Sequence, residues 1–322
     1  MRLGFTKCHG SGNDFPLIDA RDIALSGAEW AKVARALADR SGPVGGDGIV
    51  ALTGGTGDAD FGFWMRNSDG SEAETCLNGL RCVARAGFEA LGIESARVAL
   101  KASRAEVAHV ADIMPGVYGV ETRAGPASLD PAAIGLRVAA PVVDACIPGL
   151  PSTRRFTAVA MPNPHLIAFV DGVDQDELVA LGTWCEARPD LLVDRANVSF
   201  VEQRGGSLYV RTHERGVGLT DACGSAMAAS IFAAGLTERV PSGTWTTVLN
   251  PGGRVRARAD DAIVTIQGNA TFEWHGHVAV DLIGGVASDL IVTRRRDDEV
   301  AAWAALVAAA GCGIDDQKED GT

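Results

Sequence analysis

Three stretches of the chain carry apolar residues at the spacing of one helix face. Glu29–Ala38 (EWAKVARALA) and Cys82–Leu91 (CVARAGFEAL) repeat apolar positions every three or four residues. Glu299–Ala310 (EVAAWAALVAAA) does the same near the end of the chain and is followed by an acidic tail. We therefore predict an α-helix over each stretch.

Short apolar runs between these stretches predict β-strands. The chain has 39 Gly residues but only 6% aromatic residues, which suits short strands joined by tight turns better than a helical bundle. Together, the runs and the helical stretches predict a mixed α+β protein. The clearest runs are Ile49–Leu52, Phe61–Met65, Val98–Leu100, Leu166–Val170, Leu208–Arg211 and Ala262–Gln267.

Two distant segments resemble each other. FWMRNSDGSEAETC ends at Cys76 and LYVRTHERGVGLTDAC ends at Cys223; in each, a β-like run leads through a polar loop to the cysteine and then to an apolar helical stretch. A polar residue, Asn67 or Glu214, stands nine positions before the cysteine. The cysteines are 223 − 76 = 147 residues apart, nearly half the chain, which indicates two related domains.

The Gly-Pro pair at 125–126 is a suitable boundary between such domains. We expect a first domain formed by residues 1–125 plus about 276–290, which carries Cys76. The second domain is expected at 126–275 and carries Cys223. Residues 291–322 are expected to form a C-terminal helical extension and an acidic tail.

Charge and composition exclude several classes of partner. The formal charge is 29 − 41 = −12, and the densest basic run, 294–296, is followed at once by three acidic residues, so nucleic acid is not an expected partner. No apolar stretch has the length of a membrane span or the form of a signal peptide, which leads us to expect a cytoplasmic protein. Seven cysteines without a C-x-x-C pair predict free thiols and no metal site.

Cys76 and Cys223 stand where a polar loop becomes a helix. The unpaired N–H groups and the positive helix end at such a place favour a thiolate and can also hold a carboxylate. If two such cysteines flank the α-carbon of an amino acid, one thiolate can take the proton and the other thiol can return one to the opposite face, which inverts the stereocentre. The remaining cysteines are expected to be structural: Cys8, Cys82, Cys146, Cys185 and Cys312.

The same residues resemble the diaminopimelate epimerase family of cofactor-independent epimerases. The resemblance covers most of the chain, and its strength comes from several separate motifs in the right order. These motifs are Lys7-Cys8-His9-Gly10-Ser11-Gly12-Asn13-Asp14-Phe15, Asn67-Ser68-Asp69-Gly70-Ser71-Glu72 before Cys76, Asn163-Pro164-His165, Asn197, Glu214-Arg215-Gly216 and Ala222-Cys223-Gly224-Ser225.

The resemblance implies two pseudo-symmetric domains, each a mixed, mainly antiparallel, β-barrel-like sheet around a central helix, with the active site in the cleft between them. It implies that Cys76 and Cys223 are the catalytic base and acid, with roles exchanged in the reverse direction. His165 would support their ionisation, and Glu214 would meet a substrate ammonium. No cofactor is implied, and a homodimer is expected.

The resemblance also implies a set of substrate-binding residues. The reaction would interconvert LL- and meso-2,6-diaminopimelate, in lysine and peptidoglycan precursor biosynthesis. Side chains at the distal amino-acid end of the substrate would be Asn13, Asn67, Asn163, Asn197, Glu214 and Arg215. Backbone groups around the reacting carboxylate would be those of Leu77, Asn78, Gly224 and Ser225.

Two departures from the family pattern keep alternatives open. Leu77 follows the first catalytic cysteine where many members have Gly, and Gly48 stands where some have a substrate-contacting Gln. The first alternative is a racemase or isomerase of the same fold acting on another substrate, such as histidine or hydroxyproline. The second is a thiol redox or metal-binding protein that uses Cys76, Cys223 and His165, although no C-x-x-C spacing supports it.

Overall fold

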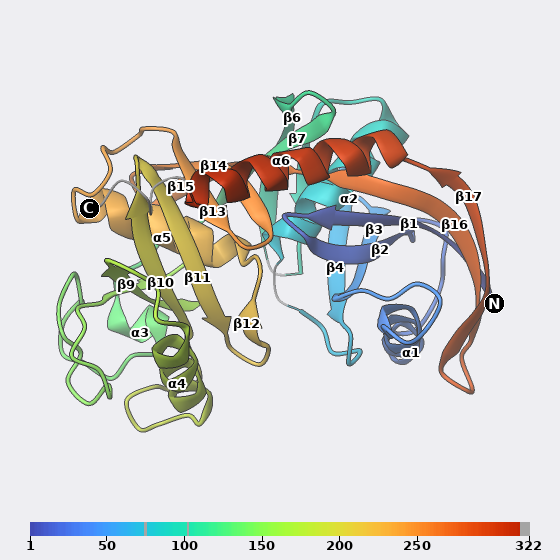
Figure 1. Ribbon diagram of the computed structural model, residues 1–322. Helices are drawn as coiled ribbons and strands as arrows, with labels where there is room; N and C mark the ends of the chain where they lie inside the picture. Colours follow the sequence, from blue (N-terminus) through green and yellow to red (C-terminus); the bar gives the residue numbers. More distant parts are fainter. Residues whose placement is uncertain (74–75, 102, 316–322) are drawn as a thin grey trace. The chain divides into compact units, whose positions relative to one another are not determined.

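The computed structural model describes residues 1–73, 76–101 and 103–315, with side chains of the last helix described as far as residue 309. The chain divides into two compact units, Met1–Thr122 with Gln267–Thr322, and Arg123–Ile266. Each unit combines a mostly antiparallel sheet with a few helices (Figure 1). In the described part of the chain, no helix is long and apolar enough to cross a membrane.

The first unit joins its strands in a fixed order of antiparallel and parallel steps. β1 pairs antiparallel with β2, β2 parallel with β3, β3 antiparallel with β4, and β4 parallel with β5. β5, β6 and β7 continue antiparallel, while β16 and β17 extend the sheet beyond β1. The strands are β1 (Arg2–Gly10), β2 (Asn13–Asp19), β3 (Gly48–Gly54), β4 (Phe61–Asn67), β5 (Ser95–Ala99), β6 (Arg104–Met114), β7 (Val117–Ala124), β16 (Thr271–Asp281) and β17 (Val286–Arg295).

The second unit follows the same order. β8 pairs antiparallel with β9, β9 parallel with β10, β10 antiparallel with β11, β11 parallel with β13, and β13 antiparallel with β14. A short strand, β12, pairs with the end of β11. The strands are β8 (Thr157–Ala160), β9 (Pro164–Val170), β10 (Asn197–Arg204), β11 (Ser207–Glu214), β12 (Gly218–Thr220), β13 (Thr246–Asn250), β14 (Gly253–Asp260) and β15 (Ile263–Asn269), which runs across the boundary of the units.

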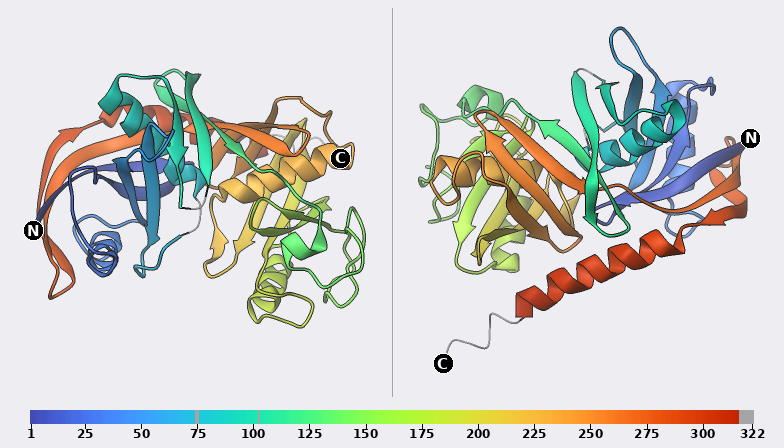
Figure 2. Two further views of the ribbon diagram at one scale, coloured as in Figure 1. Left: turned by 180° about the vertical axis from the view of Figure 1, so that it is seen from behind. Right: turned by 90° about the horizontal axis from the view of Figure 1, so that it is seen from above.

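A helix connects the strands at each parallel step, because parallel neighbours need a crossover. In the first unit these helices are α1 (Gly27–Ala38) and α2 (Leu77–Leu91); in the second they are α4 (Gln175–Glu186) and α5 (Gly224–Leu236), with a short α3 (Pro131–Ile134) before β8. α2 packs against β1 through β6, and α5 packs against β8 through β11, β13 and β14 (Figure 2). The predicted α+β class, with a duplicated and mainly antiparallel sheet around a central helix, is confirmed.

The predicted helices are present, with earlier starts than the apolar spacing indicated. α1 starts at Gly27, where Ser26 and Glu29 form a reciprocal capping box. α2 starts at Leu77, five residues before the predicted start at Cys82. The sequence pattern misses this first turn because it contains Asn78 and Gly79, which are weak helix formers but are buried here. Four of the six predicted strand runs lie entirely within strands of the structure, whereas Val98–Leu100 ends one residue after β5 and Ala262–Gln267 begins one residue before β15.

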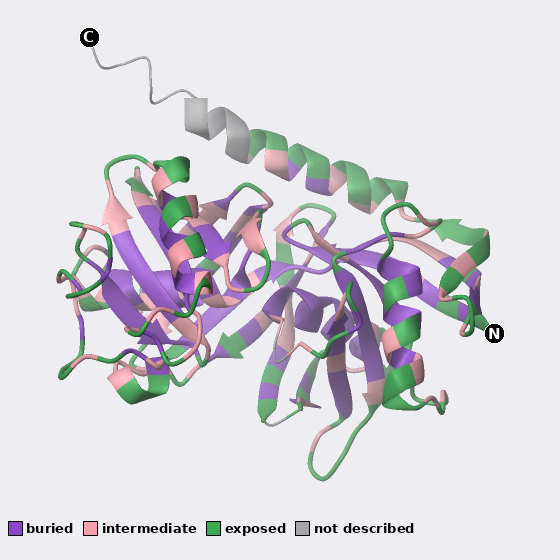
Figure 3. Ribbon diagram, turned by 90° about the horizontal axis from the view of Figure 1, so that it is seen from below, coloured by how far each residue is buried: buried purple, intermediate pink, exposed green. Residues whose placement is uncertain are grey.

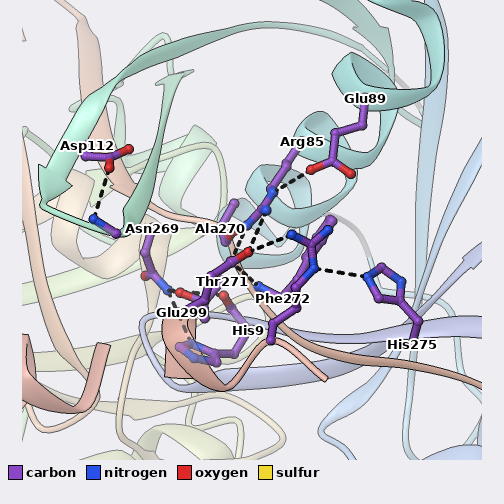
Figure 4. Close-up of polar contacts among 12 residues, drawn as sticks. His9, Arg85, Glu89, Asp112, Asn269, Ala270, Thr271, Phe272, His275 and Glu299 are labelled. Atoms are coloured by element: carbon purple, nitrogen blue, oxygen red, sulfur yellow. Dashed lines mark hydrogen bonds and ion pairs between the residues drawn. The ribbon is translucent and has the colours of Figure 1, made fainter. Parts of the chain in front are cut away.

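The C-terminal helix, α6 (Asp297–Asp315), contains the predicted helix and packs on the first unit. Trp303 and Leu306 are buried against Val117, while most of its other described side chains are exposed (Figure 3). At its first turn, Glu299 accepts two hydrogen bonds from Arg85 of α2, at 2.5 and 2.9 Å (Figure 4). α6 is therefore anchored by one buried ion pair and a small apolar contact.

Candidate active site

In the first unit, Cys76 is the N-cap residue of α2. Its backbone is extended, and its sulfur accepts a hydrogen bond from the N–H of Gly79 at 3.3 Å. Cys76 is partly exposed, and its thiol also donates to Oδ1 of Asn13, at 3.5 Å. Cys76 thus occupies the expected position, in contact with the N–H groups of a helix start.

A chain of amides surrounds Cys76. Asn13 donates from Nδ2 to the Asp47 carboxylate, so its Oδ1 faces Asn78 Nδ2, at 3.4 Å, as well as the Cys76 sulfur. Asn78 in turn accepts at Oδ1 from Nη2 of Arg81 at 2.8 Å. The structure therefore brings three predicted site residues together, Asn13, Cys76 and Asn78. Asp47 and Arg81, which we had not singled out, fix the orientation of the two amides.

Two other predicted site residues of the first unit are Leu77 and Asn67. Leu77 is the first residue of α2 and is not among the residues with positive φ, so its N–H is available as it would be with Gly. Asn67 donates from Nδ2 to the Ser71 hydroxyl at 2.9 Å, within the turn that follows β4. The role of Asn67 in substrate binding stays a prediction.

Gly48 cannot be replaced by Gln without a backbone change. It is the first residue of β3 and pairs with Asn67 of β4. A Cβ atom at Gly48 would lie 2.2 Å from the carbonyl oxygen of Arg66. The close approach of the two strands, rather than a change of substrate, accounts for glycine at this position.

In the second unit, Cys223 is the N-cap residue of α5 and is 8% exposed. Its sulfur lies 3.5 Å from the Ser225 hydroxyl, which accepts a hydrogen bond from Asn163 Nδ2 at 3.2 Å. Asn163 Oδ1 is 3.0 Å from Nε2 of His165. Four predicted site residues therefore form one network, Cys223, Ser225, Asn163 and His165.

The surroundings of Cys223 and His165 decide their protonation. Burial, and secondarily the Glu214 carboxylate, raise the pKa of the Cys223 thiol well above its ordinary value; the Ser225 hydroxyl and the Ala226 N–H act in the opposite direction. Burial, together with the positive charge of Arg215, lowers the pKa of His165 to about 3. The helix start does not make Cys223 a thiolate here, and His165 is a neutral imidazole linked to Cys223 through Asn163 and Ser225.

The remaining predicted residues of the second unit meet at the end of β11. Glu214 accepts a hydrogen bond from the Thr220 hydroxyl, and the N–H of Arg215 donates to Asn197 Oδ1 at 2.9 Å. Within the described part of the chain, the buried Nδ2 of Asn197 has no hydrogen-bond partner. The Arg215 guanidinium lies 3.7 Å from the Asp194 carboxylate. The cluster offers one carboxylate, one guanidinium and an amide N–H, which suit an amino-acid end group.

Among the described residues, no group of three or more His, Cys, Asp or Glu side chains is placed to hold a metal ion. Sequence reasoning missed Asp47, Arg81 and Thr220. The signal for Arg81 was available, since an Arg stands in the otherwise apolar run LRCV just after Cys76. Its meaning depends on burial, which the sequence pattern does not give.

The chain is similar in sequence to known diaminopimelate epimerases. The family model described as "Diaminopimelate epimerase" matches residues 5–128 and 157–272. The diaminopimelate epimerase of Clostridium acetobutylicum is 37% identical over 300 residues, covering 87% of each chain. That of Lactiplantibacillus plantarum is 37% identical over 292 residues, covering 84% of this chain and 88% of the relative.

Solved structures share the fold at low sequence identity. A hydroxyproline epimerase from Agrobacterium vitis has a TM-score of 0.62 at 16% identity, over 88% of this chain and 94% of that one. A PhzF-family phenazine biosynthesis protein from Bacillus anthracis has a TM-score of 0.62 at 14% identity, over 87% of this chain and all of that one. The duplicated fold thus occurs in proteins named for other reactions.

Proposed function

Because the chain belongs to the diaminopimelate epimerase family, we propose that it interconverts LL- and meso-2,6-diaminopimelate by moving the α-proton between two cysteine thiols. It is an isomerase that needs no cofactor for this chemistry. The observation that carries the mechanism is the position of Cys76 and Cys223 at the N-caps of α2 and α5, which occupy the same place in the duplicated topology.

The proton transfer is balanced between the two thiols. One cysteine thiolate removes the α-proton and becomes a thiol, which leaves a carbanion stabilised by the adjacent carboxylate. The other thiol donates its proton to the opposite face and becomes a thiolate. Because Cys223 is protonated in the free protein, its natural first role is that of the acid, with Cys76 as the base. Reaction in the reverse direction exchanges the two roles.

The N–H groups at the starts of α2 and α5 supply the electrostatic stabilisation. The backbone at Leu77, Asn78, Gly224 and Ser225 belongs to the first turns of these helices, where N–H groups have no partner within the helix. A carboxylate that gains negative charge in the transition state is stabilised by such fixed donors. We assign the reacting carboxylate to these groups.

The distal amino-acid end is assigned to the polar side chains. Glu214 pairs with the ammonium, Arg215 presents its planar fork to the carboxylate, and amides complete the hydrogen bonds. The amides in this assignment are Asn13, Asn67, Asn163 and Asn197. A substrate without a second amino-acid end would leave Glu214 and Arg215 without partners from the substrate, which argues against histidine or hydroxyproline.

Pure protein incubated with LL-diaminopimelate in deuterated water tests the proposal. We expect formation of the meso isomer together with incorporation of deuterium at the α-carbon, because the proton returned comes from a solvent-exchanged thiol. Chiral chromatography follows the isomers and mass spectrometry follows the deuterium. Turnover of histidine or hydroxyproline in place of diaminopimelate would establish the alternative substrate.

A cytoplasmic location, a place in lysine and peptidoglycan precursor biosynthesis, and a homodimeric state complete the proposal. They are supported by the membership of the family and by the resemblance described above. Sedimentation analysis of the purified protein tests the dimer, and a lysine-requiring strain that lacks its own epimerase tests the pathway.

A further inference from the structure

Arg81 is a wholly buried charged side chain in α2, with 0% of its surface exposed. Nε donates to the carbonyl of Asn269 at 3.0 Å, and Nη2 donates to Ser11 Oγ at 3.1 Å and to Asn78 Oδ1 at 2.8 Å. In the described part of the chain, buried Nη1 has no hydrogen-bond partner. All three acceptors are neutral, so hydrogen bonding fixes the guanidinium without balancing its charge.

Two glycines leave room for the Arg81 guanidinium. A Cβ atom at Gly268 would lie 2.7 Å from Cζ of Arg81, and one at Gly10 would lie 2.7 Å from the carbonyl oxygen of Asn78 and 3.0 Å from Nη2 of Arg81. Neither glycine is among those with positive φ, so space rather than backbone conformation requires them. β1, α2 and β15 therefore pack closely around the guanidinium.

The next arginine of the same helix face shows what a balanced buried charge looks like here. Arg85, four residues later and also buried, forms ion pairs with Glu299 and Glu89 (Figure 4). For Arg81, no described carboxylate forms such a pair, and the neighbouring groups that become negative on losing a proton are two thiols, those of Cys82 and Cys76. A buried cation without a nearby anion raises the free energy of the folded protein. Formation of an anion beside it lowers that free energy.

Cys76 is the thiol that can use this charge. Cys82 is buried in the core, whereas Cys76 is partly exposed at the helix start. The Asn78 amide accepts from Arg81 and donates to Asn13 Oδ1, the oxygen that also accepts from the Cys76 thiol. We propose that Arg81 is a positioning residue that keeps a positive charge beside Cys76, stabilises its thiolate and orients the Asn78 amide. This inference rests on the proposed role of Cys76 as the base.

Other ionisable groups around Arg81 do not compensate its charge. Burial lowers the pKa of His9, on β1, to about 4, so His9 is neutral at neutral pH. Lys7 and Asp14, on β1 and β2, form an ion pair with each other, and Arg40 also pairs with Asp14. Burial lowers the pKa of Arg81 itself to about 10, which leaves it charged at neutral pH.

The test measures the ionisation of Cys76 directly. The full-length protein is alkylated with iodoacetamide from pH 5 to 10, and the rate at Cys76 is read by mass spectrometry of its peptide. The midpoint is the pH at which the alkylation rate of Cys76 is half its maximum. In Arg81→Gln we expect this midpoint to rise by about 1–3 pH units, because a nearby opposite charge shifts the pKa of an ionisable group by that amount. Arg81→Lys should recover much of the shift, and Arg85→Gln is the matched control, with an unchanged midpoint.

Gly268→Ala provides a second route that keeps the arginine. The new Cβ displaces the guanidinium, so the Cys76 midpoint should rise while the charge of the protein is unchanged. If Arg81→Gln does not fold, this variant and Arg81→Lys carry the test. Unchanged midpoints in the folded Arg81 and Gly268 variants, or an equal rise in Arg85→Gln, would overturn the inference.

The outcome is separable from that of the proposed function. Alkylation requires no turnover, so a shifted midpoint supports Arg81 even if deuterium exchange with diaminopimelate fails. Conversely, if the protein is an active epimerase but its Cys76 midpoint is unchanged in the Arg81 variants, the proposed function stands and this inference is wrong. In an active enzyme, the acidic limb of the kcat/KM profile should move upward with the same variants.

Discussion

The starts of α2 and α5 have the same backbone arrangement but opposite electrostatic surroundings. Each has a cysteine at the N-cap with extended φ and ψ, −132° and 106° for Cys76 and −116° and 109° for Cys223. Five residues after the cysteine, α2 has buried Arg81 where α5 has buried Ala228. Nine residues before it, the first unit has Asn67 where the second has Glu214.

This difference separates the two thiols chemically. Under the inference above, buried Arg81 favours the thiolate of Cys76, whereas burial and the Glu214 carboxylate raise the pKa of Cys223 and keep it protonated. A base and an acid can then be present together before substrate arrives. The two sulfurs therefore share one backbone position in the duplicated fold, while the side chains around them differ in charge.

Removal of either sulfur should have the largest effect. Cys76→Ala and Cys223→Ala should each lower epimerisation by about 10²–10⁴-fold, since each removes one proton-transfer group. Chiral chromatography of the product measures the loss, and circular dichroism checks folding. Cys146→Ala, which removes an exposed cysteine, is the control and should retain activity. Full epimerase activity in either single variant would reject the two-thiol mechanism.

Arg215→Lys should have the next largest effect. An ammonium cannot reproduce the bidentate fork, and charged hydrogen bonds contribute about 1.5–3 kcal/mol, so kcat/KM for diaminopimelate should fall about 10- to 100-fold. The preference for diaminopimelate over lysine, expected to reach roughly 10⁴-fold, should narrow. The comparison uses kcat/KM for both substrates in both proteins. Arg204→Lys, whose arginine pairs with Glu202, should leave the preference unchanged.

Glu214→Gln should lower the pKa of the Cys223 thiol and so make Cys223 ionise more readily. Loss of the carboxylate removes a cause that raises the pKa of Cys223, so that pKa should fall and alkylation should begin at lower pH. Burial, the larger cause, remains, so the pKa of Cys223 should fall without returning to its ordinary value. Peptide mass spectrometry after timed alkylation gives the result. A Cys223 midpoint that stays fixed or rises would show that Glu214 does not govern this thiol.

Gly48→Asn should have the smallest effect on chemistry and a measurable effect on stability. Gly48 and Asn197 are the first residues of β3 and β10, so this change gives β3 the residue found at the corresponding position of the second unit. The added Cβ meets the Arg66 carbonyl, and overpacking of this kind costs about 1–3 kcal/mol. Thermal denaturation measures the loss. Thr53→Asn, near the exposed end of the same strand, controls for the effect of asparagine alone.

The sequence by itself determined the α+β class, the duplication and the family. These features follow from local spacing and from motifs that survive as residue order: apolar periodicity, the two cysteine segments 147 residues apart, and the series of Asn, Glu and Arg motifs. The start of α2 was placed five residues late because Asn78 and Gly79 weaken the helical pattern at the position where Cys76 acts as its cap.

Only the tertiary structure decided that Cys223 is protonated and which groups Arg81, Gly48 and Gly268 approach. Arg81 contacts Asn269, 188 residues away, and the space for its guanidinium depends on a glycine that no local pattern associates with it. Burial and Coulomb energy depend on distances in space, while sequence patterns report neighbours along the chain. For that reason the sequence could identify the two sulfurs, but only the packing around them distinguished one from the other.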